Sequence, residues 1–182
     1  MAAEPTTWVV DASVAFAWFA SVPGSEQAAW LLEPTSAVVL LAPDLVLVEL
    51  LNAGWKSLRL GAITAEQFQM LAHRGAEPFS HLVPSTALLA RAAHWCLELD
   101  HPVDHCLYVA LAERERATLV TADQRLLRKL QTAKPGLPAA IDLARLTESR
   151  QQEALSRLEA VASSSQSSSD EPWPRESLHD RP

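Results

Sequence analysis

Short apolar runs alternate with longer helix-compatible segments along most of this chain. The runs that favour β-strands are residues 7–10, 37–41, 81–83, 117–121 and 139–143. The segments compatible with helices are residues 12–20, 26–33, 45–60, 65–77, 85–99, 104–116 and 124–130. This alternation predicts an α/β fold in which a parallel sheet carries helices on both faces.

Polar residues typical of helix starts set the expected boundaries. Asp44 is expected to open the helix at 45–60, and Ser85 is expected to cap the helix at 85–99. Thr64 and Gln67 have the spacing of a capping box, in which each side chain accepts a hydrogen bond from the other's backbone.

The character of the chain changes near residue 147. Residues 1–146 have the alternating pattern of one domain, whereas residues 147–182 read as an exposed helix at 150–162 followed by a tail. Six of the seven residues from Ser163 to Ser169 are serine, and an acidic, proline-rich end follows. This tail is predicted to be disordered, because it has too little apolar surface to offset its ordering entropy.

Composition narrows the class of protein. The hydrophobic and charged fractions, 48% and 20%, are those of a soluble globular protein. A net charge of −7 argues against a broad nucleic-acid coat, so a polyanion would need a local basic patch or a metal ion. The two cysteines read as reduced core residues. We expect a cytoplasmic protein without a signal peptide or membrane span, since no apolar run is long enough.

Acidic residues follow two of the predicted strands. Asp11 comes directly after the strand at 7–10, and Asp123 comes two residues after the strand at 117–121. Ligands of open α/β sheets bind outside the carboxyl ends of the strands, where these carboxylates would meet. The alternative for each is a simple helix cap.

Two further positions lie on predicted helices. Glu49 is embedded in an apolar helix, where a buried carboxylate is costly unless it is paired or bound to a metal. Asn52, three residues later, could orient that carboxylate, although Glu49 could also lie on a narrow solvated stripe. Asp104 and His105 open another apolar helix, and the alternative there is a capping aspartate beside a solvent-facing histidine.

Four clustered acids have a consequence that isolated caps lack. Two carboxylates about 4 Å apart repel by roughly 4 kcal/mol at an effective dielectric constant near 20. Such a cluster must hold protons or bind a cation, and oxygen ligands suit Mg²⁺ or Mn²⁺. An ion of this kind can activate water for displacement at phosphorus.

Four strings in this order, VVDASVAFAWF, APDLVLVELLNAGWK, HPVDHCLYVALAE and LVTADQRL, resemble a PIN-domain ribonuclease. The similarity covers residues 7–145 and is greatest to the VapC-like toxins of bacterial toxin–antitoxin pairs. The resemblance implies a three-layer α/β/α sandwich with a small, mainly parallel central sheet. It also implies an RNA-cleaving site that uses Mg²⁺ or Mn²⁺, a homodimer and a cognate antitoxin. The matching acids are Asp11, Glu49 and Asp123, with Ser13, Asn52 and Thr121 as polar support.

The third acidic position departs from the family pattern, in which an aspartate lies three residues before the tyrosine. Here His105 occupies that position and Asp104 comes one residue earlier, about 100° away around a helix. Three outcomes are open. Asp104 could reach the ion as the helix N-cap, His105 could ligate and favour Mn²⁺ or Zn²⁺, or the site could be weakened.

Basic residues lie close to the acids in sequence. Arg125, Arg128 and Lys129 follow Asp123, and Lys56 follows Glu49. These cations could hold RNA phosphates beside the acidic site, or they could simply form solvated helix faces. The remaining histidines have no metal-ligand spacing among themselves and receive no role; they are His73, His81, His94 and His101.

Two functions from different classes follow. The first is a metal-dependent endoribonuclease toxin, with metal and catalytic roles for Asp11, Glu49, Asp104 and Asp123 and with His105 as a further ligand candidate. The second is a catalytically silent PIN-like module that binds RNA or protein. In this case the displacement of the acid from position 105 to Asp104 would account for the loss of catalysis.

Overall fold

A computed structural model describes residues 6–33, 38–132 and 136–146 of the chain. The exposed helix predicted at 150–162 and the serine-rich tail lie outside the described residues. Their structure and the domain boundary after residue 146 therefore stay predictions.

Five parallel strands form the central sheet, in the order β3-β2-β1-β4-β5. The strands are β1 (Thr6–Val10), β2 (Val38–Pro43), β3 (His81–Val83), β4 (Thr118–Thr121) and β5 (Ala140–Asp142). The last three residues of β1 and of β4 are buried, as expected for a parallel sheet with both faces covered. The prediction of a small parallel sheet is confirmed.

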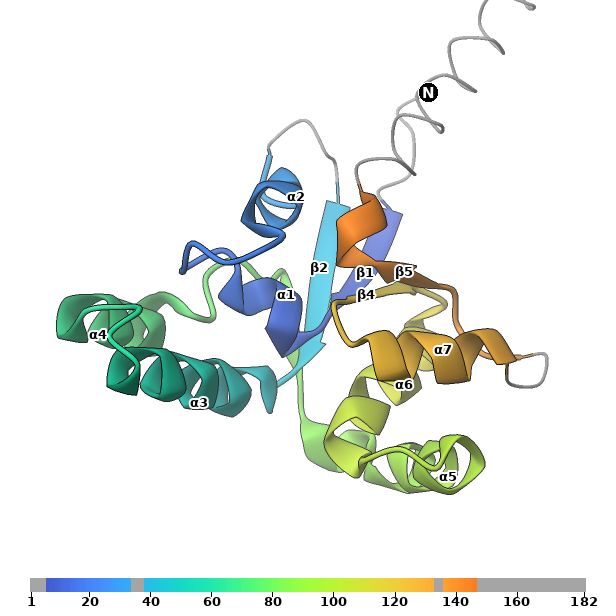
Figure 1. The fold of residues 1–182 in the computed structure, drawn as a ribbon. Helices are drawn as coiled ribbons and strands as arrows, with labels where there is room; N and C mark the ends of the chain where they lie inside the picture. Colours follow the sequence, from blue (N-terminus) through green and yellow to red (C-terminus); the bar gives the residue numbers. More distant parts are fainter. Residues whose placement is uncertain (1–5, 34–37, 133–135, 147–182) are drawn as a thin grey trace, which may run out of the picture. The chain divides into compact units, whose positions relative to one another are not determined.

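Helices cover both faces of the sheet (Figure 1). The α-helices are α1 (Ala12–Phe16), α2 (Ser25–Trp30), α3 (Val46–Arg59), α4 (Ala65–Arg74), α5 (Leu89–Leu99), α6 (Val103–Glu115) and α7 (Gln124–Thr132). Two 3-10 turns are η2 (Ser85–Ala87) and η3 (Leu143–Arg145). Figure 1 shows α1, α3 and α4 on one side of the strands and α5, α6 and α7 on the other. The predicted α/β/α sandwich is therefore confirmed.

Helix α6 lies at the centre of the core. Every residue from Cys106 to Ala112 is buried, because α6 packs against β1, β2 and β4 and against α5. This packing explains why the sequence CLYVALA has no polar face. Among the described residues, every helix is too short or too polar to cross a lipid bilayer.

Local boundaries differ from the sequence expectation at Asp44 and Ser85. The Asp44 carboxylate accepts hydrogen bonds from the Ser85 backbone amide, at 2.9 Å, and from the Ser85 hydroxyl, so it links the end of β2 to η2. Helix α3 begins at Val46 without a side-chain cap, and Ser85 opens a 3-10 turn before α5. The capping box of Thr64 and Gln67 forms as predicted.

Candidate metal centre

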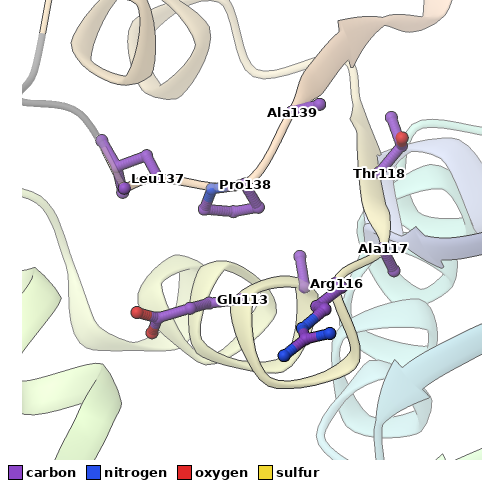
Figure 2. Close-up of a pocket in the computed structure, with 9 residues that line it drawn as sticks. Glu113, Arg116, Ala117, Thr118, Leu137, Pro138 and Ala139 are labelled. Atoms are coloured by element: carbon purple, nitrogen blue, oxygen red, sulfur yellow. The ribbon is translucent and has the colours of Figure 1, made fainter.

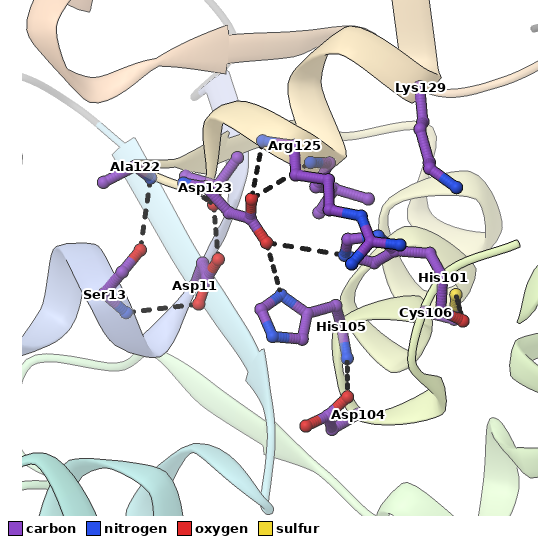
Figure 3. A network of polar contacts seen from close by, with 12 residues as sticks. Asp11, Ser13, His101, Asp104, His105, Cys106, Ala122, Asp123, Arg125 and Lys129 are labelled. Atoms are coloured by element: carbon purple, nitrogen blue, oxygen red, sulfur yellow. Dashed lines mark hydrogen bonds and ion pairs between the residues drawn. The ribbon is translucent and has the colours of Figure 1, made fainter. Parts of the chain in front are cut away.

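Asp11 anchors a polar site at the carboxyl edge of the sheet (Figure 3). It follows β1 and caps α1, where its Oδ1 accepts a hydrogen bond from the Ser13 backbone amide at 3.1 Å. Its Oδ2 accepts the hydroxyl proton of Thr121, the last residue of β4. Asp11 is only 5% exposed, so it is a helix cap and also a buried carboxylate at the carboxyl end of a strand.

Hydrogen bonds tie the ends of β1 and β4 together. The Ser13 hydroxyl accepts the Ala122 amide at 3.1 Å, and the Thr121 hydroxyl oxygen accepts the Asp123 amide at 3.0 Å. Ser13 and Thr121 therefore support the site by joining two strand ends, and this brings Asp11 and Asp123 to the same edge.

Asp123 divides its two oxygens between structure and site. Oδ1 accepts the amides of Arg125 and Leu126, at 2.8 and 3.0 Å, and so caps α7. Oδ2 lies 3.1 Å from His105 Nδ1 and 3.4 Å from His101 Nε2. Oδ1 therefore fixes the carboxylate, and Oδ2 faces the two imidazoles.

Glu49 reaches the site from α3, but its hydrogen-bond partner is not the one expected. The hydroxyl of Tyr108 on α6 donates to Glu49 Oε2. Asn52 is exposed, and no hydrogen bond joins it to Glu49 in the part of the chain described. The sequence interpretation missed Tyr108, although the chain's one tyrosine, inside an apolar helix, needs a partner for its hydroxyl.

The first turn of α6 decides how Asp104 and His105 are oriented. Helix α6 begins at Val103 with Pro102 as its N-cap, so Asp104 is already helical and does not reach inward as a cap. Its carboxylate accepts the His105 amide at 3.0 Å and lies beyond His105 from Asp123 (Figure 3). The His105 ring extends to Asp123, so the histidine takes the position nearest the two strand-end acids.

His101 belongs to the same edge, although the sequence interpretation gave it no role. It is 4% exposed, and one ligand atom each from His101, His105 and Asp123 lie within 4.8 Å of one another. The four-residue spacing of His101 and His105 was the available signal. It was weak because His101 precedes the helix, so no helix face relates the two rings.

Burial controls the protonation of the acids. Burial raises the pKa of Asp11, and the hydrogen bonds from Thr121 and Ser13 oppose it. Burial also raises the pKa of Glu49, opposed by the Tyr108 hydroxyl and assisted by the charges of Asp11 and Asp104. Burial by itself would raise the pKa of Asp123 as well. Two backbone hydrogen bonds and the charges of the two histidines outweigh burial and hold this pKa below its ordinary value.

The donor set fits a divalent ion. Burial chiefly raises the pKa of Asp11 and of Glu49, and the neighbouring charges of Asp123 and Asp11 add to it, so a cation would lower this cost. Among the described residues, the group whose ligand atoms all lie within 4.8 Å of one another is His101, His105 and Asp123. In addition, His105 Nδ1 and both ring nitrogens of His101 are buried without a hydrogen-bond partner among the described residues. Unpartnered nitrogens beside carboxylates are suited to metal coordination.

The predicted RNA-binding cations differ in their surroundings. Arg125 and Arg128 are exposed on α7, and Lys56 is exposed on α3. Lys129 instead donates to the backbone oxygen and the carboxylate of Asp100. Three of the four cations are therefore available to a ligand.

A separate hollow of about 230 Å³ lies at the opposite end of β4 (Figure 2). The Glu113 carboxylate at its rim is already bonded to the Arg91 guanidinium and the Trp95 indole. The hollow lies at the start of β4, whereas Asp123 follows the end of β4, so the hollow is not part of the acidic site.

Comparison with known proteins gave consistent matches. A family model described as PIN domain matches residues 8–131. PAE2754 from Pyrobaculum aerophilum is similar at 25% identity with a TM-score of 0.54, over 79% of this chain and 98% of that chain. A structure of VapBC2 from Rickettsia felis bound to a promoter DNA fragment is similar at 16% identity with a TM-score of 0.53. The match covers 75% of this chain and 98% of that chain. No curated protein matches this chain.

Proposed function

The chain belongs to the PIN domain family, and from this premise we propose that it is a metal-dependent endoribonuclease acting as a toxin of a toxin–antitoxin pair. PIN domains are generally nucleases. The observation that carries the proposal is the hydrogen-bonded junction of two strand ends, which holds the carboxylates of Asp11 and Asp123 together. Glu49 adds a third carboxylate from α3.

The residues that would hold the ion are Asp11, Glu49 and Asp123, with His105 beside them and Asp104 toward Glu49. A bound divalent ion supplies an activated water and neutralises charge on the phosphate. Thr121 and the Ser13 amide fix the Asp11 carboxylate before any substrate arrives, and Tyr108 does the same for Glu49. Fixed ligands need little reorganisation during reaction, which favours catalysis.

Mg²⁺ and Mn²⁺ are the proposed ions because the donors are chiefly carboxylate oxygens. The His105 nitrogen beside Asp123 moves the preference toward Mn²⁺, since imidazole binds Mg²⁺ poorly. Manganese is therefore the first ion to use in cleavage assays.

RNA is the proposed substrate, and local cations would hold it on a chain whose net charge is −7. Arg125, Arg128 and Lys56 are exposed on the two helices that follow or carry the acids. Contacts from such side chains to phosphates position a strand without reading its sequence. Lys129 would first have to leave Asp100.

A cognate antitoxin and a second copy of the chain are the proposed protein partners. Helices α3 and α4 expose Val48, Trp55, Leu60 and Met70, with Trp55 at 50% exposure and Leu60 at 84%. Exposed apolar side chains gathered on neighbouring helices favour a protein contact. The fold shared with VapBC2 supports this part of the proposal.

The test is the replacement Asp11→Asn, assayed for Mn²⁺-supported cleavage of single-stranded RNA and for growth inhibition on expression. We expect both to be lost, by at least about a hundredfold for cleavage, while the fold is kept. The control Glu26→Gln changes an exposed acid on α2 and should behave as wild type. Undiminished toxicity of Asp11→Asn would refute the nuclease.

The second candidate is a silent module that binds RNA or protein. It is favoured by one feature, the histidine at the third acidic position of the family pattern. Calorimetric titration with Mn²⁺ separates the two, because a silent module would bind no ion at millimolar concentration. Binding abolished by Asp11→Asn would support the nuclease.

A further inference from the structure

Two imidazoles and one carboxylate converge beside the acidic cluster (Figure 3). His105 Nδ1 and His101 Nε2 lie 3.1 and 3.4 Å from the same oxygen, Asp123 Oδ2. A tetrahedral zinc ion with bonds of roughly 2.1 Å places its ligand atoms about 3.4 Å apart. Two of the three donor separations are therefore close to the edge of such a tetrahedron, and all three lie within 4.8 Å.

The ring arrangement agrees with this spacing. The His101 and His105 rings are perpendicular, and their centroids are 5.1 Å apart. Two imidazoles bound to one tetrahedral ion have centroids about 5 Å apart. The rings thus need little movement to share an ion.

The burial of His101 adds to the spacing. Its side chain is 2% exposed, Nε2 lies 3.4 Å from Asp123 Oδ2, and neither ring nitrogen makes a hydrogen bond of normal geometry among the described residues. A buried polar group without a partner is costly, and a metal bond would remove that cost. Asp123 Oδ1 is occupied by the cap of α7, so Oδ2 is the oxygen left for one metal bond.

We propose that His101, His105 and Asp123 bind a transition-metal ion of the Zn²⁺ class, at a site that adds His101 and shares Asp123 and His105 with the proposed nuclease centre. Two imidazoles with one carboxylate form a donor set that Zn²⁺ prefers and Mg²⁺ does not. Three protein ligands leave a position for water.

The residues around this site are partly exposed, although the imidazole nitrogens are buried. The side chains of His105 and Asp123 are 31% and 21% exposed. A hollow of about 450 Å³ is bordered by His101, Pro102 and Arg125.

The site has a consequence that rests on the proposed function. Asp123 Oδ2 is also the oxygen available to the nuclease ion, and a zinc ion would withdraw it. Zinc is therefore an inhibitor of Mn²⁺-supported cleavage, and its affinity depends on His101.

Calorimetric titration of the full, metal-free chain with ZnCl₂ tests the proposal. We expect one zinc ion per chain and at least about tenfold weaker binding by His101→Gln. The control His73→Gln alters an exposed histidine on α4 and should keep the wild-type affinity. Circular dichroism with thermal unfolding checks that each variant is folded.

Absence of zinc binding by the wild type, or equal affinity of His101→Gln, would overturn the site. If His101→Gln is not folded, Co²⁺ spectra of the wild type decide instead. Intense visible bands indicate the tetrahedral ion, and weak octahedral bands contradict it.

Asp11→Asn separates this proposal from the nuclease. It should lose cleavage while keeping zinc affinity, because Asp11 is not among the three donors. A wild type that binds zinc through His101 but cuts no RNA would sustain the zinc site and refute the nuclease.

Discussion

Three polar residues are buried in the part of the chain described, namely Asp11, His101 and Thr121. All three lie at the carboxyl edge of the sheet, where β1 and β4 end. Elsewhere the described core is apolar. Burial of polar groups is costly, so its restriction to this edge indicates function rather than packing.

The ionised carboxylate of Asp11 should lower the free energy of unfolding of the metal-free protein. Because its folded pKa is raised by burial, the folded protein holds this proton more tightly than the unfolded chain does. Stability of the metal-free protein therefore falls as pH rises from the ordinary pKa through the raised one. Asp11→Asn removes the titrating carboxylate and should therefore stabilise the metal-free protein at pH 7 relative to wild type.

Thermal unfolding in the presence of a chelator, from pH 4 to pH 8, measures this difference. The gap between Asp11→Asn and wild type should widen with pH. A constant gap over that range would show that Asp11 does not carry the effect.

Tyr108→Phe should change the pKa of Glu49 while keeping the packing of the aromatic ring in the core. The hydroxyl that it removes opposes the rise that burial imposes on the pKa of Glu49. The pKa should therefore rise further, and the acid side of the pH–rate profile for cleavage should move to higher pH. Stability should fall by about 1 kcal/mol. A profile identical to wild type would mean that this hydrogen bond does not tune Glu49.

The start of α2 depends on a backbone conformation that favours glycine. Gly24 has φ of +91°, and a Cβ there would lie 2.7 Å from Leu143 Cδ2 in η3. Gly61 also has positive φ, but a Cβ there would meet no atom within 4 Å. The two glycines separate conformational strain from steric overlap.

Gly24→Ala should destabilise the protein by about 2–4 kcal/mol, through left-handed strain and overlap with buried Leu143. Gly61→Ala should cost about 1 kcal/mol, because strain acts alone. Denaturant unfolding of both variants measures the difference. Equal losses would mean that Leu143 shifts freely and that the contact between α2 and η3 is loose.

The fold of the described domain is completed by residues that follow β5. Leu143 and Leu146, in and just after η3, are buried in the core. A chain that stops after Leu146 should therefore keep the wild-type melting temperature and cleavage rate. A chain that stops after Asp142 loses both leucines and should be destabilised by about 4 kcal/mol or more.

Calorimetric melting of the two shortened chains tests the boundary predicted after residue 146. A large loss of stability in the longer chain would mean that residues 147–182 contribute to the fold. That result would contradict the interpretation of this segment as an exposed helix and tail.

The sequence alone determined the elements and the edge at which they meet. Strand and helix periodicity predicted the parallel sheet, because the side-chain pattern along each segment records which faces are buried. Asp11 and Asp123 were identifiable because an acid after a buried strand must lie at the carboxyl edge. Boundaries failed where a distant partner intervened, as at Asp44, which bonds to Ser85 instead of capping α3.

Tertiary structure decided which side chains face one another. His101 joins His105 at Asp123, and Tyr108 replaces Asn52 as the partner of Glu49. These partners follow from the packing of α6 against β1, β2 and β4, which no local pattern records. The orientation of Asp104 and His105 depended on a helix that begins at Val103, one residue earlier than expected. Each residue turns a helix by about 100°, so a difference of one position determines which side chain faces Asp123.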